Sequence, residues 1–177
     1  MTSIDILGPH VPVIHNTLIA IIDSQMILVS IAVVLFYFLK DRQALRYSLL
    51  CLAFFINGYL TYDLILSVDG GKVYRYIYWA AMDVLFIAIV AYWALKDKMY
   101  MWQSIVCQLV VIPAPLLQLF RLVDRHLMDL SYSGYLYMTV LPLVNYATVF
   151  LCFAPLIYLI GRNTKRNRSS PSSQDAS

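Results

Sequence analysis

Long apolar runs, each bounded by charged or turn-forming residues, divide the sequence into five segments. A helix needs about 20 apolar residues to cross the roughly 30 Å of hydrocarbon in a bilayer. The pattern therefore predicts five membrane-spanning helices, over residues 17–39, 45–66, 74–95, 100–120 and 132–160. The predicted fold is all-α, a polytopic integral membrane helix bundle with five transmembrane helices.

Prolines lie inside the last two runs, where they remove backbone hydrogen bonds and kink helices. Pro113 and Pro115 fall in the fourth run, and Pro142 and Pro155 fall in the fifth. The fifth run is also longer than one crossing requires. We expect its helix to be tilted, kinked or frayed at its outer end.

Polar segments flank the predicted 17–160 bundle. Residues 1–16 contain no Lys or Arg, so they do not resemble a signal peptide, and they are interpreted as an extracytoplasmic lead-in. Residues 161–177 begin with basic residues and continue Ser-rich, with little apolar surface to bury. They are predicted to form a disordered cytoplasmic tail whose basic start can contact anionic lipid.

The distribution of basic residues orients the bundle, because cytoplasmic loops carry an excess of Lys and Arg. With five spans and the N-terminus outside, the cytoplasmic side receives Lys40, Arg42, Arg46, Lys96, Lys98, Arg162, Lys165, Arg166 and Arg168, and the outer side receives Lys72, Arg75, Arg121 and Arg125. This bias predicts an outer N-terminus and a cytoplasmic C-terminus. Short loops favour a bacterial inner membrane as the location, with the lipid bilayer as the first partner.

Composition agrees with a membrane location. The chain is 61% hydrophobic and 13% charged, with a mean hydropathy of +0.71, whereas soluble domains carry roughly 25% charged residues. All ten acidic residues are Asp. The net charge of +3 and the lack of a basic stripe with interleaved aromatics argue against nucleic acid as a partner.

Catalytic and cofactor motifs are missing from the sequence. It contains no HExxH, GxSxG or glycine-rich phosphate loop, so we predict that the protein is not an enzyme. Cys51, Cys107 and Cys152 are far apart and predict buried free thiols. The three histidines all fall outside the spans, so no cofactor and no metal is predicted.

Aspartates inside the apolar runs mark the candidate site, because a carboxylate at the bilayer centre costs about 2.5–3.5 kcal/mol. Counted at about 1.5 Å per residue from the inner basic boundary, Asp23, Asp63 and Asn145 lie about 25 Å above the inner edge, and Asp83 about 20 Å. Asn57 lies lower, near the middle of the membrane. These five residues are the candidate ligand- or ion-binding residues of a polar layer in the outer half of the bundle.

Helical periodicity predicts the direction in which Asp83 and Asp23 face. Asp23 shares one helical face with Asn16 and Ser30, each seven residues away. Asp83 shares a stripe with the small residues Ala80, Ala91 and Ala94, which let helices approach closely, so it is predicted to face the bundle interior. Asp63 lies near the outer end of its helix. There a helix-tying hydrogen bond or exposure at the interface is the favoured interpretation. Arg75 and Arg121 lie near the outer boundary, where they can reach inward to partner a carboxylate.

Two functions of different classes fit this pattern. The favoured one is binding or transport of a cation, a proton or a small cationic solute in the outer pocket, with a homo-oligomer completing the pathway. The alternative is a sensor or accessory subunit that works through a membrane partner protein. Asp83→Asn abolishes flux or ion-dependent stabilisation under the first, whereas deletion of residues 163–177 has the larger effect under the second.

Overall fold

The computed structural model describes residues 11–70, 73–126 and 133–168, with side chains for residues 24–70, 73–125 and 133–160. Within these ranges all regular secondary structure is helical. The helices are α1 (Val11–Leu39), α2 (Arg42–Val68), α3 (Tyr74–Leu95), α4 (Met101–Val111), α5 (Pro113–His126) and α6 (Ser133–Arg168). The predicted all-α architecture is confirmed.

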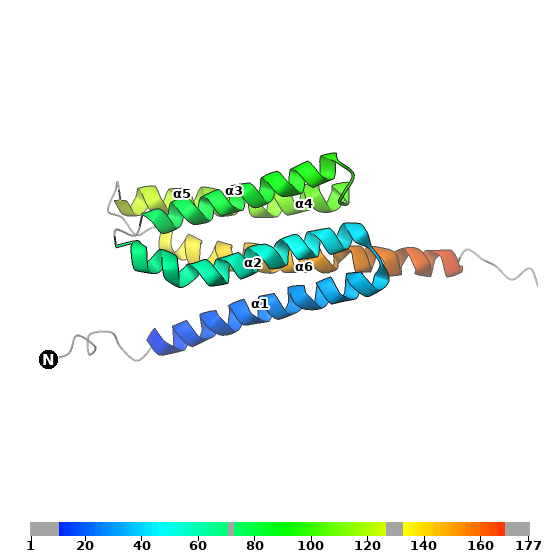
Figure 1. Cartoon of the computed structure of the whole chain (residues 1–177), viewed down its shortest axis with the longest axis horizontal. Coiled ribbons are helices and arrows are strands. Elements are labelled where there is room, and N and C mark those ends of the chain that lie inside the picture. The colour runs from blue at the N-terminus through cyan, green and yellow to red at the C-terminus, as the bar shows by residue number, and fades with distance from the viewer. Residues whose placement is uncertain (1–10, 71–72, 127–132, 169–177) are drawn as a thin grey trace, which may run out of the picture.

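The helices lie side by side along one long axis (Figure 1). Helices α3, α4 and α5 form one edge of the bundle, α1 forms the opposite edge, and α2 and α6 lie between them. Helices α4 and α5 are separated by Ile112 alone and together form one rod, Met101–Arg125. Pro113 begins α5, a position where its missing N–H has little cost.

Within the described residues, four helices are long and apolar enough to cross a membrane: Arg42–Val68, Tyr74–Leu95, Met101–Arg125 and Ser133–Ile160. The part of α1 with described side chains, Ser24–Leu39, is a shorter apolar helix. The chain is therefore a small multi-pass membrane protein. The face predicted for α3 agrees with its burial, because Ala80 and Ala94 are buried whereas Val84 and Leu85 are exposed.

One end of the bundle is fastened by its loops, residues 40–41 and 96–100, and we call it the basic-loop end. Lys40 and Asp97 adopt left-handed φ angles of 56° and 53°, which end the preceding helices. Asp41 then caps α2 by accepting hydrogen bonds from the backbone N–H groups of Gln43 and Ala44, both at 3.1 Å. Tyr100 donates to Asp41 at 2.8 Å and thereby joins the two loops.

The apolar core fills the half of the bundle next to the basic-loop end. Its largest fully buried side chains include Phe36 from α1, Tyr47 from α2 and Val90 from α3. The three cysteines are buried in this core as free thiols, as the sequence predicted. At the opposite end, which we call the cavity end, polar and aromatic side chains replace much of the apolar packing.

Candidate functional site

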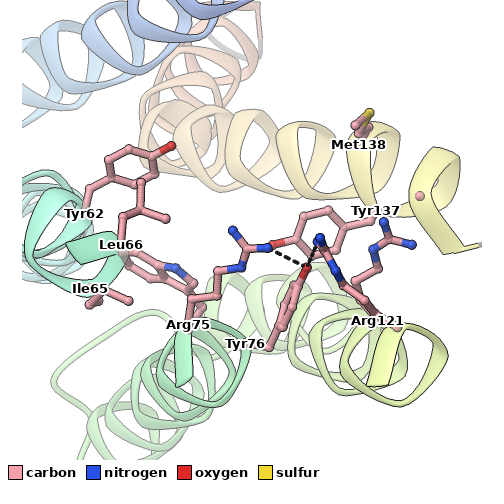
Figure 2. Close-up of a pocket in the computed structure, with 11 residues that line it drawn as sticks. Tyr62, Ile65, Leu66, Arg75, Tyr76, Arg121, Tyr137 and Met138 are labelled. Atoms are coloured by element: carbon pink, nitrogen blue, oxygen red, sulfur yellow. Dashed lines mark hydrogen bonds between the residues drawn. The ribbon is translucent and has the colours of Figure 1, made fainter. Parts of the chain in front are cut away.

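A cavity of about 360 Å³ opens at the cavity end, between α2, α3, α5 and α6 (Figure 2). Arginines and aromatic residues dominate its lining. The lining residues are Tyr62, Ile65 and Leu66 from α2, Arg75, Tyr76 and Trp79 from α3, Arg121 and Arg125 from α5, and Gly134, Tyr137 and Met138 from α6. Its volume lies in the range of small-molecule sites.

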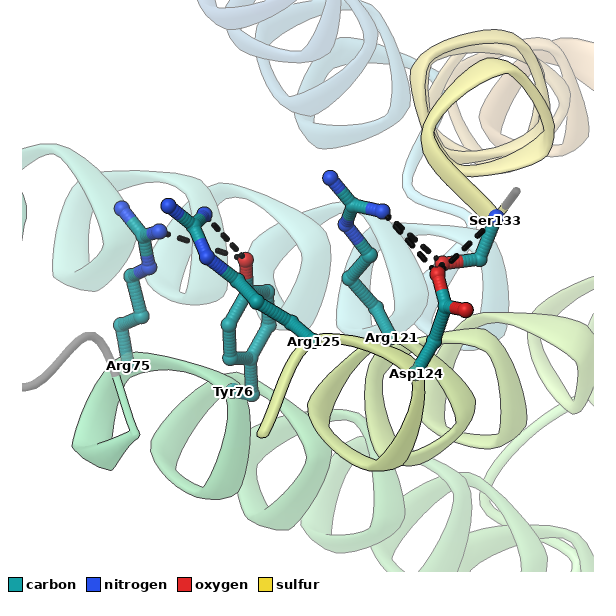
Figure 3. A network of polar contacts seen from close by, with 6 residues as sticks. All are labelled: Arg75, Tyr76, Arg121, Asp124, Arg125 and Ser133. Atoms are coloured by element: carbon teal, nitrogen blue, oxygen red, sulfur yellow. Dashed lines mark hydrogen bonds and ion pairs between the residues drawn. The ribbon is translucent and has the colours of Figure 1, made fainter. Parts of the chain in front are cut away.

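Helix geometry places the three arginines together. Arg75 lies in the first turn of α3, and Arg121 and Arg125 lie one turn apart on the same face near the end of α5. Helices α3 and α5 pack against each other. The guanidinium groups of Arg75 and Arg125 both donate to the hydroxyl of Tyr76, at 3.2 and 3.4 Å (Figure 3). The buried Tyr76 thus holds two cationic groups at one point.

Each of two arginines has a nearby carboxylate that is also bound to backbone N–H groups. Asp69 lies 3.8 Å from Arg75 and accepts hydrogen bonds from the backbone N–H groups of Val73 and Tyr74, at 2.8 and 3.0 Å. It therefore caps α3. Burial alone raises the pKa of Asp69, but these N–H donors and the charge of Arg75 outweigh it and lower the pKa below 3.8.

Asp124 repeats this arrangement between α5 and α6. Its carboxylate accepts from Arg121 at 3.2 Å, from the backbone N–H of Ser133 at 3.1 Å and from the Ser133 hydroxyl (Figure 3). The bond to Ser133 satisfies a free donor at the start of α6. Arg121 also donates to the Ser133 hydroxyl at 3.0 Å, so one guanidinium nitrogen makes both contacts.

The balance of charge around the cavity is positive. Three arginines line it, two carboxylates form ion pairs with them, and three minus two leaves one positive charge among the described residues. Arg125 has no carboxylate partner within the described part of the chain. Within the described part of the chain Arg125 donates one hydrogen bond, to Tyr76, which leaves most of the N–H donors of its guanidinium group unused. The cavity therefore offers unused N–H donors to an anion.

None of the five residues predicted from the sequence lines this cavity. Asp83 is half-buried in the bundle, where its carboxylate accepts a 2.7 Å hydrogen bond from the Gln118 amide of α5. Asn57 donates to the Tyr78 hydroxyl at 3.0 Å and ties α2 to α3. Asp63 and Asn145 are exposed. The side chain of Asp23 lies outside the described residues. Ion binding by these five residues stays a prediction.

The sequence predicted the positions of the arginines but not their partners. Arg75 and Arg121 were expected near the outer boundary, reaching toward a carboxylate, but the partners in the structure are Asp69 and Asp124, which follow or end helices. The tyrosines and Trp79 at the start of α3 are residue types that also form interfacial aromatic belts, so their pattern does not single out a cavity. The signal that finds the site is the Arg121-Asp124-Arg125 spacing, which places all three residues on one face of α5.

Comparison of the chain with protein-family models, with curated proteins and with solved structures finds no match.

Proposed function

We propose that this chain is a five-span protein of the bacterial inner membrane that binds an anionic solute in its arginine cavity. The observation that carries the proposal is the convergence of Arg75, Arg121 and Arg125 on one cavity, with two of them held by the Tyr76 hydroxyl. Like charges brought together repel, and an anion between them relieves that repulsion. The proposal keeps the expected outer pocket and small-solute binding but changes the sign of the ligand's charge.

The length of α1 supports the fifth span. Its 29 residues reach about 44 Å at 1.5 Å per residue, enough to cross the hydrocarbon region. With five crossings, the basic-loop end faces the cytoplasm and the cavity end faces outward, because Lys40, Arg42, Lys96 and Lys98 all lie at the former. The cavity then lies at the depth of the outer-leaflet headgroups.

The chemistry of the lining favours binding over catalysis. Guanidinium groups stay protonated and act as fixed hydrogen-bond donors, so they orient an anion without exchanging protons with it. Among the described residues, no group of three or more His, Cys, Asp or Glu side chains is arranged to hold a metal ion. Transport of the bound solute, and the oligomer that transport requires, remain part of the proposal.

The test is ligand-dependent thermal stability of the full chain in a neutral detergent. An anion that binds only the folded state stabilises it by RT ln(1 + [L]/Kd), about 2.7 kcal/mol at 100 times Kd. We expect sodium phosphate to raise the unfolding temperature more than sodium chloride at equal ionic strength. The additional rise should shrink in Arg125→Gln and in Tyr76→Phe.

The matched control is Arg42→Gln, which removes an exposed arginine at the basic-loop end. It should keep the full response. Phosphate also stabilises proteins in general, because it is excluded from their surfaces. This effect is common to the parent chain and all variants, so it cancels when their responses are compared. An identical phosphate response in the parent chain, Arg125→Gln and Tyr76→Phe would refute anion binding in the cavity.

A further inference from the structure

We infer that the anion bound in the cavity is a phosphate group carried on an apolar tail, the chemistry of an anionic lipid headgroup. This inference rests on the anion binding proposed above and names the ligand class. It comes from the two different walls of the cavity and from where the apolar wall leads.

The cavity is amphipathic. Helices α3 and α5 supply its arginines and the Tyr76 hydroxyl, whereas α2 supplies Ile65 and Leu66, and α6 supplies Met138. In Figure 2 Ile65 and Leu66 project from α2 and Met138 projects from α6, whereas Arg75 and Arg121 project from α3 and α5. A free inorganic anion uses only the first wall. A ligand that is charged at one end and apolar at the other uses both.

The apolar wall is also part of the lipid-facing surface. Leu66 is 42% exposed, Tyr62 is 48% exposed and Met138 is 75% exposed, although all three line the cavity. Neighbouring side chains on the surface of α2, including Leu64 and Val68, are exposed too. In a bilayer such surfaces meet acyl chains or the apolar side of the interface. The apolar wall of the cavity therefore lies at the surface of the bundle, where Leu66 of α2 and Met138 of α6 are exposed.

The size of the cavity agrees with a ligand whose charged end lies inside the cavity and whose apolar tail lies outside it. A volume of about 360 Å³ equals roughly a dozen waters at about 30 Å³ each. That space holds a phosphate and a few further atoms but no pair of long acyl chains. The tail of the bound ligand then lies along the exposed side chains of Leu66 and Met138.

The arginines suit phosphate in particular. A guanidinium group is a planar fork of donors that binds two oxygens of one phosphate, and several such groups can surround its remaining oxygens. Gly134 lies beside Arg121 on the α6 side, because a Cβ atom at that position would be in van der Waals contact, 3.6 Å from both terminal nitrogens of Arg121. A larger side chain at residue 134 would press on the guanidinium group and occupy the adjoining space.

Trp79 provides a local reporter, since it lines the cavity. The other two tryptophans lie next to the 96–100 loop of the basic-loop end, Trp93 in the last turn of α3 and Trp102 in the first turn of α4. Trp93→Phe with Trp102→Phe leaves Trp79 as the sole tryptophan, and Trp79→Phe with Trp93→Phe leaves Trp102 as the matched control. Each full-length variant is titrated in maltoside detergent with dihexanoyl phosphatidic acid, dihexanoyl phosphatidylcholine or inorganic phosphate, while tryptophan emission is recorded.

We expect the emission of Trp79 to change saturably with phosphatidic acid, with a half-saturation concentration at least tenfold below that for inorganic phosphate. Phosphatidylcholine, whose charge is balanced, should bind at least tenfold more weakly than phosphatidic acid. Arg125→Gln should raise the half-saturation concentration for phosphatidic acid at least tenfold, as loss of a charge-assisted hydrogen bond does. Gly134→Leu should also raise the half-saturation concentration for phosphatidic acid, although it alters no charge. Arg42→Gln should leave this concentration unchanged.

The outcomes separate this inference from the function on which it rests. Equal half-saturation for inorganic phosphate and phosphatidic acid would overturn the apolar tail while leaving the anion site in place. Equal binding of phosphatidylcholine would overturn selection for an anionic headgroup. Trp79 emission that responds to none of the three ligands, or that changes only as Trp102 emission does, would overturn both proposals.

Discussion

At the scale of single residues, the aspartates at helix ends organise this protein more than those inside its helices. Asp41, Asp69 and Asp124 each accept backbone N–H groups at the start of α2, α3 and α6. Free N–H groups at a helix start need acceptors, and the short Asp side chain is among the best. This role accounts for part of the preference for Asp over Glu in the sequence.

Asp69→Asn tests this capping role and its pH dependence. Asn keeps a capping oxygen but lacks the negative charge beside Arg75. The unfolding temperature of the variant should therefore fall below that of the parent chain at neutral pH. A lowered pKa stabilises the fold above the ordinary value of 3.8, and that stability is lost as the pH falls from there toward the lowered value. The difference in unfolding temperature between the parent chain and the variant should therefore shrink as the pH falls below 3.8. A difference that stays constant would contradict this account.

Tyr100 offers a second test outside the membrane-spanning segments. Burial, with the hydrogen bond to Asp41 next, raises the pKa of Tyr100 to about 12. The ultraviolet difference spectrum between the parent chain and Tyr100→Phe should show no phenolate until the pH approaches that value. The variant should also lose about 1 kcal/mol of stability with the hydrogen bond. A phenolate that forms near pH 10, the ordinary value, would show that the Tyr100 side chain is solvated.

Residue identities alone predicted some of these positions. The stripe of small residues placed Asp83 inside the bundle, and the structure finds it there, bound to Gln118. Periodicity cannot say which element lies opposite, so the sequence did not predict Gln118, or Asp69 and Asp124 as partners of Arg75 and Arg121. Those pairings depend on how helices pack.

At the scale of the elements, apolar periodicity was the dependable signal. Helix α3 covers Tyr74–Leu95, the residues of the predicted third span, because charged or turn-forming residues bound it on both sides. Proline had two different effects. Pro113 begins α5 after a one-residue break, whereas Pro142 and Pro155 lie within α6. The sequence marks proline positions, but the neighbouring helices decide whether the chain breaks there.

The contact of α2 with α3 depends on a hydrogen bond that a double-mutant cycle can measure. Asn57 donates to Tyr78 at 3.0 Å, and Thr61 lies within hydrogen-bonding distance of the same hydroxyl. The cycle combines Asn57→Leu, Tyr78→Phe and the double variant, with unfolding measured in detergent. We expect a coupling energy of about 1 kcal/mol, in the range found for hydrogen bonds between membrane helices. Strictly additive losses of stability would show that Asn57 and Tyr78 do not stabilise the contact between these helices.

At the scale of the whole molecule, the two ends of the bundle differ in construction. The basic-loop end is closed by contacts between loops, such as the 2.8 Å hydrogen bond from Tyr100 to Asp41. The cavity end is held by arginine, tyrosine and aspartate side chains around an open space. The sequence predicted the helices and the basic bias, but the cavity arises where four helices meet, which no single segment encodes.

The proposed orientation can be tested by labelling cysteines in intact cells with a membrane-impermeant maleimide. The three native cysteines are buried, so background labelling should be low. Ser67→Cys, exposed at the cavity end, should label from outside, whereas Lys98→Cys, exposed at the basic-loop end, should label only after permeabilisation. The reverse pattern would place the arginine cavity on the cytoplasmic side.

The most direct measurement of anion binding is anomalous diffraction from crystals of the full chain soaked in tungstate, a heavy analogue of phosphate. We predict a tungsten peak in the cavity, within hydrogen-bonding distance of the guanidinium groups of Arg75, Arg121 or Arg125, and its loss in Arg125→Gln crystals. Tungsten bound only at the basic-loop end, or a cavity without a peak when other sites are filled, would contradict the account.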